Sequence, residues 1–132
     1  MDTKTLITKH EGRKNRLYQD SKGNWTIGIG YNLSSEPISD TVIDQLYNDY
    51  MEGLEAQMLA IYPWYRTIQD PYKSAVDDMR FNLGPARFDE FQTFIGFLAA
   101  GNYKQAAADL RTTLVYKQLP VRYEELAKIL ES

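Results

Sequence analysis

The sequence predicts an α+β fold with a small N-terminal β-lobe, a long connecting helix and a C-terminal helical lobe. Three observations predict this architecture. Apolar and polar residues alternate on either side of a turn at 20–24, which is typical of a β-hairpin. Apolar residues then recur at steps of three and four from 40 to 61, which indicates one long helix. Beyond residue 66, Pro, Gly and Asn separate a series of short helical segments.

The length of 132 residues suits one domain. We expect a single domain over 1–132, with the β-lobe at about 12–38 and the connecting helix at about 39–61. The helical lobe is expected at about 66–132, together with a first helix at 2–11.

The composition excludes several classes of protein. Without Cys and with a single His, the chain has neither a disulfide framework nor a visible metal site, and we expect no cofactor. No apolar run approaches about 18 residues, so no membrane insertion is expected. No basic run is interleaved with aromatic residues, which argues against nucleic-acid binding. The N-terminal stretch has its short apolar part broken by Thr, Lys and His, unlike a signal peptide.

The net charge of −3 is unevenly distributed along the chain, because residues 1–33 carry +3 and residues 34–132 carry −6. A basic N-terminal part can attract an anionic polymer. It can equally be a solvated helix end and loop, and the sequence leaves both interpretations open.

Glu11 is predicted to lie at the C-terminal end of the first helix. Asp2 or Thr3 can cap that helix at its start, and Gly12 is a natural residue at its end. The negative end of the helix dipole disfavours ionisation of a carboxyl group there, and burial would add to the effect. Glu11 therefore suits a general acid, although a plain surface residue at a helix end fits the pattern as well.

The stretch 16–29 predicts a hairpin with its turn at 20–24. Thr26 and Gly28 fall on one face of the return strand, and Gly28 and Gly30 leave the backbone uncovered there. Such glycines mark a bulge or a close approach of a ligand to the main chain.

The remaining elements follow from their end signals. Ser39 or Asp40 can cap the long helix, and Asp70 with Pro71 opens the next one. In all, four or five short helices are expected in 66–132. Five aromatic residues are expected in the core rather than as sugar platforms, namely Trp64, Tyr65, Phe88, Phe91 and Phe94.

Two carboxyl groups in different environments are what glycosidic bond hydrolysis requires. Asp20 lies in a turn beside Lys22 and backbone N–H groups, so it has reason to stay ionised while Glu11 is protonated. Thr26 on the facing strand can hold a water against Asp20. Arg122 is a candidate to pair with Glu11 and orient it, but such a pair would oppose protonation of Glu11.

These residues form the pattern E-x8-D-x5-T within HEG…LYxDxxGxWTIGIGYxL, which closely resembles the phage-type lysozymes (muramidases) of glycoside hydrolase family 24, the T-even phage enzymes among them. Three further segments resemble the family in the expected order, namely FNLG at 81–84, FLAAGNYKQAA at 97–107 and YKQLPVR at 116–122. The resemblance implies a lysozyme-like fold with Glu11 as general acid and with Asp20 and Thr26 positioning water in an inverting reaction. It implies cleavage of the β-1,4 bond between N-acetylmuramic acid and N-acetylglucosamine in peptidoglycan. It also implies a set of cleft-lining residues, namely Gly30, Asn32, Phe81, Phe94 and Asp109.

The chain departs from the family in three respects. The region between the β-lobe and the long helix is shorter than in the T-even relatives, so a reduced upper lip of the cleft is expected. Phe94 and Asp109 replace small polar or amide groups, and Tyr31 and Asn32 replace His and Leu. The net charge is acidic, whereas many muramidases are basic.

By the resemblance we expect a monomer that binds peptidoglycan glycan strands, is made in the host cytoplasm and acts on the cell wall after release. Two alternatives stay open. One is a lysozyme-fold module that binds or scaffolds without catalysis, and the other is the same chemistry on a chitin-like glycan.

Overall fold

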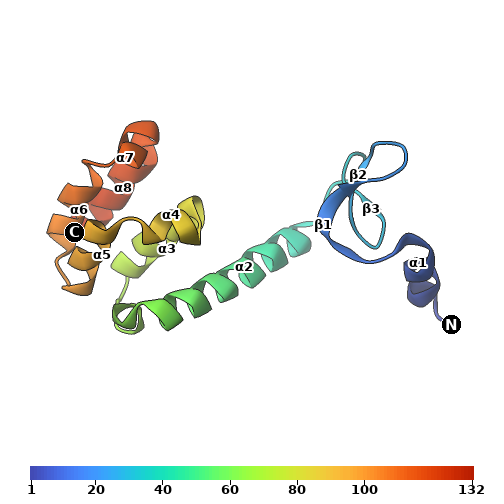
Figure 1. The fold of residues 1–132 in the computed structure, drawn as a ribbon, viewed down its shortest axis with the longest axis horizontal. Helices are drawn as coiled ribbons and strands as arrows, with labels where there is room; N and C mark the ends of the chain where they lie inside the picture. The colour runs from blue at the N-terminus through green and yellow to red at the C-terminus, as the bar shows by residue number, and fades with distance from the viewer. The chain divides into compact units, whose positions relative to one another are not determined.

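The computed structural model describes all 132 residues, and the chain divides into two compact units, Met1–Asn48 and Asp49–Ser132. The chain has eight α-helices, one short 3-10 helix and one three-stranded antiparallel sheet near the N-terminus (Figure 1). The predicted α+β class with a lysozyme-like order of elements is confirmed. The prediction that the lobes form one domain, and that the first helix belongs to the helical lobe, stays a prediction.

Helix α1 spans Thr3–Glu11 and begins and ends as predicted. The Thr5 N–H donates to Oδ1 of Asp2 at 2.7 Å, so Asp2 is the N-cap. Gly12 ends the helix at a φ of 82°, and its N–H donates to the Thr8 carbonyl at 2.8 Å. Glu11 is thereby held at the last helical position, directly before the chain enters the sheet.

The sheet has the order β1-β2-β3, with β1 at Lys14–Gln19, β2 at Trp25–Gly28 and β3 at Tyr31–Asn32. The sequence predicts only the β1–β2 hairpin. Strand β3 has two residues, which is too short to show an alternating pattern, and it forms by pairing with β2.

Cross-strand pairing sorts the side chains of the sheet onto two faces. Thr26 is opposite Tyr18 on one side and Asn32 on the other, and residues directly opposite each other share a face. Ile27 and Tyr31, also opposite each other, lie on the other face and line a largely apolar hollow of about 540 Å³. The predicted site residues of the sheet therefore lie on the more polar face.

Helix α2 spans Asp40–Ile61, close to the predicted bounds. The Val42 N–H donates to the Ser39 hydroxyl at 3.3 Å, so Ser39 caps the helix. Only Leu54 and Met58 of its predicted apolar face are buried. The earlier positions of that face are exposed, namely Val42, Ile43, Leu46 and Tyr50. No helix in the structure, α2 included, combines the length and the apolar character needed to cross a membrane.

Six α-helices follow in the second unit, where the sequence predicts four or five. They come after the 3-10 helix η1 at Pro63–Arg66 and are α3 at Tyr72–Leu83, α4 at Pro85–Asp89, α5 at Gln92–Ala99, α6 at Tyr103–Leu110, α7 at Leu114–Gln118 and α8 at Pro120–Glu131. Helices α4 and α7 are the ones that the sequence pattern does not show clearly, because helices of five residues are too short for an apolar period.

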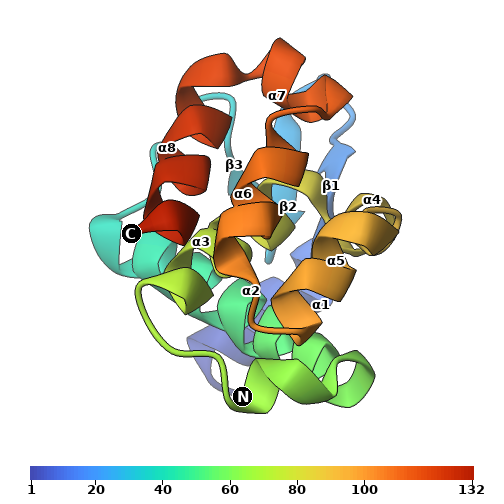
Figure 2. The ribbon, with the colours of Figure 1, turned by 90° about the vertical axis from the view of Figure 1, so that its left-hand side faces the viewer.

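The core of the second unit forms where α6 packs against α5 and α8, and where α3 packs against α4 and α8 (Figure 2). Its largest fully buried apolar side chains come from five elements and are Tyr123, Phe88, Phe94, Met58 and Met79. The prediction that the aromatic residues belong to the core is confirmed, because Tyr65, Phe88 and Phe94 are buried and Trp64 and Phe91 pack against them.

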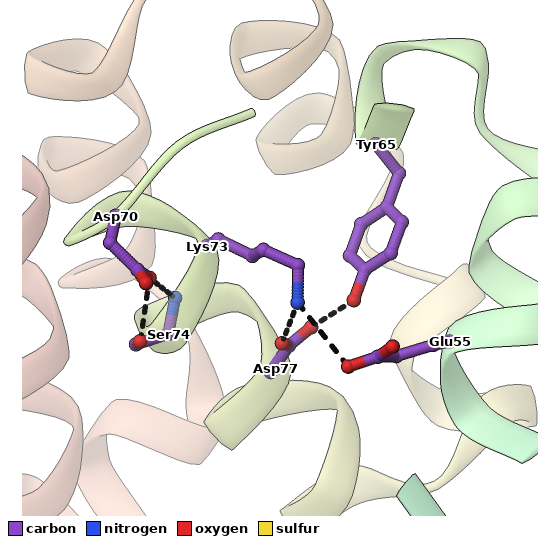
Figure 3. Close-up of polar contacts among 6 residues, drawn as sticks. All are labelled: Glu55, Tyr65, Asp70, Lys73, Ser74 and Asp77. Carbon is purple, nitrogen blue, oxygen red and sulfur yellow. Dashed lines mark hydrogen bonds and ion pairs between the residues drawn. The ribbon is translucent and has the colours of Figure 1, made fainter. Parts of the chain in front are cut away.

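A polar cluster joins α2, η1 and α3 at the side of this core (Figure 3). The Tyr65 hydroxyl donates to Oδ1 of Asp77 at 2.6 Å, and Nζ of Lys73 lies 2.8 Å from Oδ2 of Asp77 and 3.4 Å from Oε1 of Glu55. Burial and the bond to Asp77 raise the pKa of Tyr65 to about 12. The hydroxyl therefore stays protonated and acts as a donor at neutral pH.

Candidate functional site

Glu11 at the end of α1 lies against Gly30, which connects β2 to β3. A β-carbon built on Gly30 would be 2.7 Å from Oε2 of Glu11 and 2.9 Å from its Cδ. Gly30 also has a φ of 69°, a left-handed conformation that only glycine adopts without strain. Two independent requirements therefore call for glycine at this position, and one of them is room for the Glu11 carboxylate.

Asp20 occupies the mouth of the hairpin turn, where the turn itself binds its carboxylate. Oδ1 accepts the Lys22 N–H at 2.9 Å and the Asn24 N–H at 2.8 Å, and Oδ2 accepts from Nδ2 of Asn24 at 3.3 Å. The backbone N–H of Asn24, with smaller contributions from Lys22 and the Asn24 amide, lowers the pKa of Asp20 below its ordinary value of 3.8. Asp20 is therefore ionised at neutral pH, as predicted from its turn.

Thr26 follows on β2 and is only 3% exposed. Its hydroxyl donates to the Asn24 carbonyl at 3.0 Å. Since that hydrogen is used, the remaining lone pairs of Oγ1 can only accept a hydrogen bond. Asn24 thus binds Asp20 through its N–H groups and Thr26 through its carbonyl, and it links the two predicted water-positioning residues.

Asn32 lies directly opposite Thr26 in the β2–β3 pair. Its Oδ1 accepts the Ser34 N–H at 2.9 Å, which holds the amide at the start of the following loop. The first unit thus links its predicted site residues in two sets, Glu11 with Gly30, and Asp20 with Thr26 and Asn32.

The other predicted site residues lie in the second unit. Phe81 is 44% exposed and meets the Tyr50 ring edge-on, with 5.0 Å between centroids, while Asp109 is half-buried on α6. Phe94 is 1% exposed within the core, so its side chain offers no surface to a substrate in this structure. Nε of Arg122 pairs with Oδ1 of Asp78 at 2.8 Å, and its expected pairing with Glu11 stays a prediction.

Two functional candidates were not predicted from the sequence. Asn24 has a signal, because an Asn four residues after an Asp in a turn can cap that carboxylate. Arg80 has none, since it stands between Met79 and Phe81 in a helical pattern and yet is 1% exposed. No group of three or more His, Cys, Asp or Glu residues is arranged to hold a metal ion.

The phage lysozyme family model matches residues 8–119, a range that includes all the site residues named above except Arg122. The chain is 20% identical to a probable T4-type lysozyme 2 of Dictyostelium discoideum, over 98% of this chain and 93% of that protein. It is also 20% identical to the pre-baseplate central spike protein Gp5 of Enterobacteria phage T4. That alignment covers 98% of this chain but only 28% of the spike protein.

Both alignments are longer than the chain itself. They extend over 158 and 159 positions, whereas the chain has 132 residues. The two relatives therefore carry residues in the matched region that this chain lacks.

Proposed function

The chain belongs to the phage lysozyme family, and from that premise we propose that it is a muramidase acting on peptidoglycan. The proposed reaction hydrolyses the β-1,4 bond between N-acetylmuramic acid and N-acetylglucosamine. The observation that supports it best is the grouping of Glu11 against Gly30 with Asp20 and Thr26 joined through Asn24, all within one compact unit.

Glu11 is the proposed general acid. It would donate its proton to the glycosidic oxygen as the bond breaks. Its place at the last residue of α1 holds its carboxyl group against Gly30. Gly30 leaves the carboxyl group accessible, because no side chain stands between the backbone and Oε2.

Asp20 and Thr26 are proposed to position the attacking water. Two backbone N–H groups occupy Oδ1 of Asp20, whereas Oδ2 has one long bond and retains lone pairs for a water hydrogen. The second hydrogen of that water can be accepted by Oγ1 of Thr26. The low pKa of Asp20 makes it a weak base, so orientation of water and charge stabilisation are its proposed main contributions.

Attack by this water from the face opposite the leaving group would invert the anomeric carbon, which requires a spacing of roughly 6.5–9.5 Å between the carboxyl groups. Gly30, Asn32, Phe81 and Asp109 are the proposed glycan contacts. Phe94 is proposed only as part of the core of the second unit, which carries Phe81 and Asp109, because it is buried.

The direct test measures how fast the protein clears a suspension of purified cell walls, which is monitored as the loss of turbidity. We expect the wild type to clear walls at least about 100-fold faster than Glu11→Gln or Asp20→Asn, in line with the loss of a positioned acid or base. Glu36→Gln, an exposed acid of the same unit, is the matched control and should keep full activity. If the wild type clears cell walls no faster than Glu11→Gln does, the proposed enzymatic activity is excluded.

Mass spectrometry of the products identifies the bond. A muramidase leaves N-acetylmuramic acid at the new reducing end, and an NMR spectrum taken early in the reaction shows α-anomer if the configuration inverts. Release of fragments from chitin but not from cell walls would instead support the same chemistry on another glycan.

A second candidate function is a wall-binding module without catalysis. Two observations favour it. The chain matches only 28% of the length of the spike protein, and it lacks residues that both relatives carry in the matched region. In that case wild type and Glu11→Gln would sediment with cell walls equally and neither would clear them.

A further inference from the structure

A hollow of about 340 Å³ lies within the second unit and has no part in the proposed hydrolysis. The hollow is lined by Arg80 of α3, Pro85 of α4 and five residues of α2, namely Asp49, Tyr50, Gly53, Leu54 and Gln57. The wall thus combines a guanidinium group, a carboxylate and an amide with apolar surface, which is the usual make-up of a small-molecule site.

Arg80 has one donor without a partner, although it is the most deeply buried charged side chain of the protein, at 1% exposure. Its Nη1 lies 2.7 Å from Oδ1 of Asp89, and its Nη2 donates to Oε1 of Gln57 at 3.3 Å. Its Nε–H has no acceptor. Buried donors in native proteins nearly always have one, so this group calls for an acceptor that a ligand can supply.

The geometry of the guanidinium group indicates where that acceptor would sit. The Nε–H and one N–H of Nη2 point along the same edge of the planar group, so one acceptor placed there meets both. Gln57 binds Nη2 only through a long bond of 3.3 Å, and Gln57 is exposed on α2. Rotation of Gln57 would therefore free Nη2 of Arg80 for a ligand in the hollow, which both residues line.

The charges around the hollow favour a neutral ligand over an anion. The charge of Arg80 is already balanced by Asp89, and Asp49 places another carboxylate in the wall. A second anion would be repelled by both carboxylates. A secondary amide fits instead, because its carbonyl can accept from Arg80, its N–H can donate to Asp49, and a methyl group can contact Leu54 and Pro85.

We propose that this hollow binds a secondary amide group through Arg80 and Asp49. If the proposed function holds, the cell wall supplies two such groups, the acetamido groups of its sugars and the peptide bonds of its stem peptides. The site would then be a second contact with the wall, outside the reacting centre.

Gly53 allows the hollow to be filled without unfolding the protein. A β-carbon built on Gly53 meets no atom within 4 Å, so Gly53→Leu can place its side chain in the hollow. Gly96 on α5 has equally open surroundings and does not line the hollow, so Gly96→Leu is the matched control.

The test is an NMR titration of the full chain, following the ¹⁵N-labelled Nε–H of Arg80, which is assigned by its loss in Arg80→Lys. The probes are N,N′-diacetylchitobiose and N-acetyl-L-alanine methylamide, and Glu11→Gln is used as the background so that nothing is hydrolysed. We expect at least one probe to shift the Arg80 signal saturably, with affinity reduced about ten-fold or more in Gly53→Leu and unchanged in Gly96→Leu.

A shift with the chitobiose alone assigns the site to acetamido groups, and a shift with the peptide amide alone assigns it to stem peptides. The proposal is overturned if neither probe shifts the signal, if Gly53→Leu binds as well as Gly96→Leu, or if acetate shifts the signal and the amides do not. Wall clearing by the wild type is scored separately, so an inactive protein that binds an amide contradicts only the proposed hydrolysis.

Discussion

The carboxylate of Glu11 lies so close to Gly30 that a β-carbon on Gly30 would be 2.7 Å from its Oε2. This contact connects the end of the first helix to the link between the last two strands. It sets the proposed acid beside open backbone, where a sugar ring can approach.

Gly30→Ala is therefore expected to displace Glu11 and lower wall-clearing activity at least about ten-fold, because small misplacements of a catalytic group are costly. It should also destabilise the protein by roughly 1–2 kcal/mol through its left-handed backbone. Gly23→Ala is the control, since Gly23 has a φ of 80° with nothing within 4 Å of its built β-carbon. Both variants should lose similar stability in urea unfolding, and only Gly30→Ala should lose activity; equal activity in the two would refute the role of the contact.

The carboxyl group of Asp20 is expected to titrate below its ordinary pKa of 3.8, because the Asn24 and Lys22 N–H groups bind its ionised form. A lowered folded-state pKa contributes stability that is present above 3.8 and is lost as the pH falls through the lower value. Activity that depends on ionised Asp20 should therefore persist as the pH falls to about 4. A ¹³C NMR titration of the Asp20 carboxyl group measures this directly, and a midpoint at or above 3.8 would contradict it.

Thr26→Val removes the hydroxyl group while nearly keeping the side-chain shape. We expect activity to fall about 100-fold, since the water would lose its second acceptor. Stability should fall by about 1–3 kcal/mol, because the Asn24 carbonyl loses its donor in a buried place. Thr26→Ser is the control, and it should keep most of the activity. If Thr26→Val clears walls as fast as Thr26→Ser, the hydroxyl has no part in the reaction.

The ion pair of Arg80 with Asp89 should matter more for stability than that of Arg122 with Asp78. Arg80 is 1% exposed, and removing its partner leaves a buried charge less compensated, although Asp89 itself is 37% exposed. Asp89 also accepts a hydrogen bond from the Tyr62 hydroxyl. Asp89→Asn is expected to cost about 1–3 kcal/mol after allowance for that exposure.

Arg122 and Asp78 are 40% and 42% exposed, so Asp78→Asn should cost less than about 1 kcal/mol. Urea unfolding of the two variants gives the comparison. A larger loss of stability for Asp78→Asn than for Asp89→Asn would contradict the ranking.

Tyr65→Phe removes the donor to Asp77 in the polar cluster shown in Figure 3 and is expected to cost about 1–3 kcal/mol, because the ring is 3% exposed and the bond is to a carboxylate. Tyr72→Phe is the comparison, since the Tyr72 hydroxyl donates to the Ser132 carbonyl in an exposed place. It should change the unfolding free energy by no more than about 0.5 kcal/mol. Equal effects of the two substitutions would show that the cluster does not stabilise the core.

Helices whose ends carry capping residues could be predicted from the sequence. Asp2 and Gly12 bound α1, and Ser39 starts α2, because caps act over three or four residues and are readable locally. Strand β3 and helix α7 could not be predicted, since two and five residues are too few to show a period and both depend on neighbours that are already in place.

The candidate site divides in the same way. Three properties of the site are local, namely the residue types, their spacing and the turn that keeps Asp20 ionised. The sequence by itself therefore determined that Glu11, Asp20 and Thr26 belong to one short segment of helix, turn and strand. Only the tertiary structure decided that Glu11 lies against Gly30, that Phe94 is buried and that Arg80 keeps an unpaired donor beside a hollow. These facts depend on contacts between residues distant in the chain, and such contacts follow from packing, which no local pattern encodes.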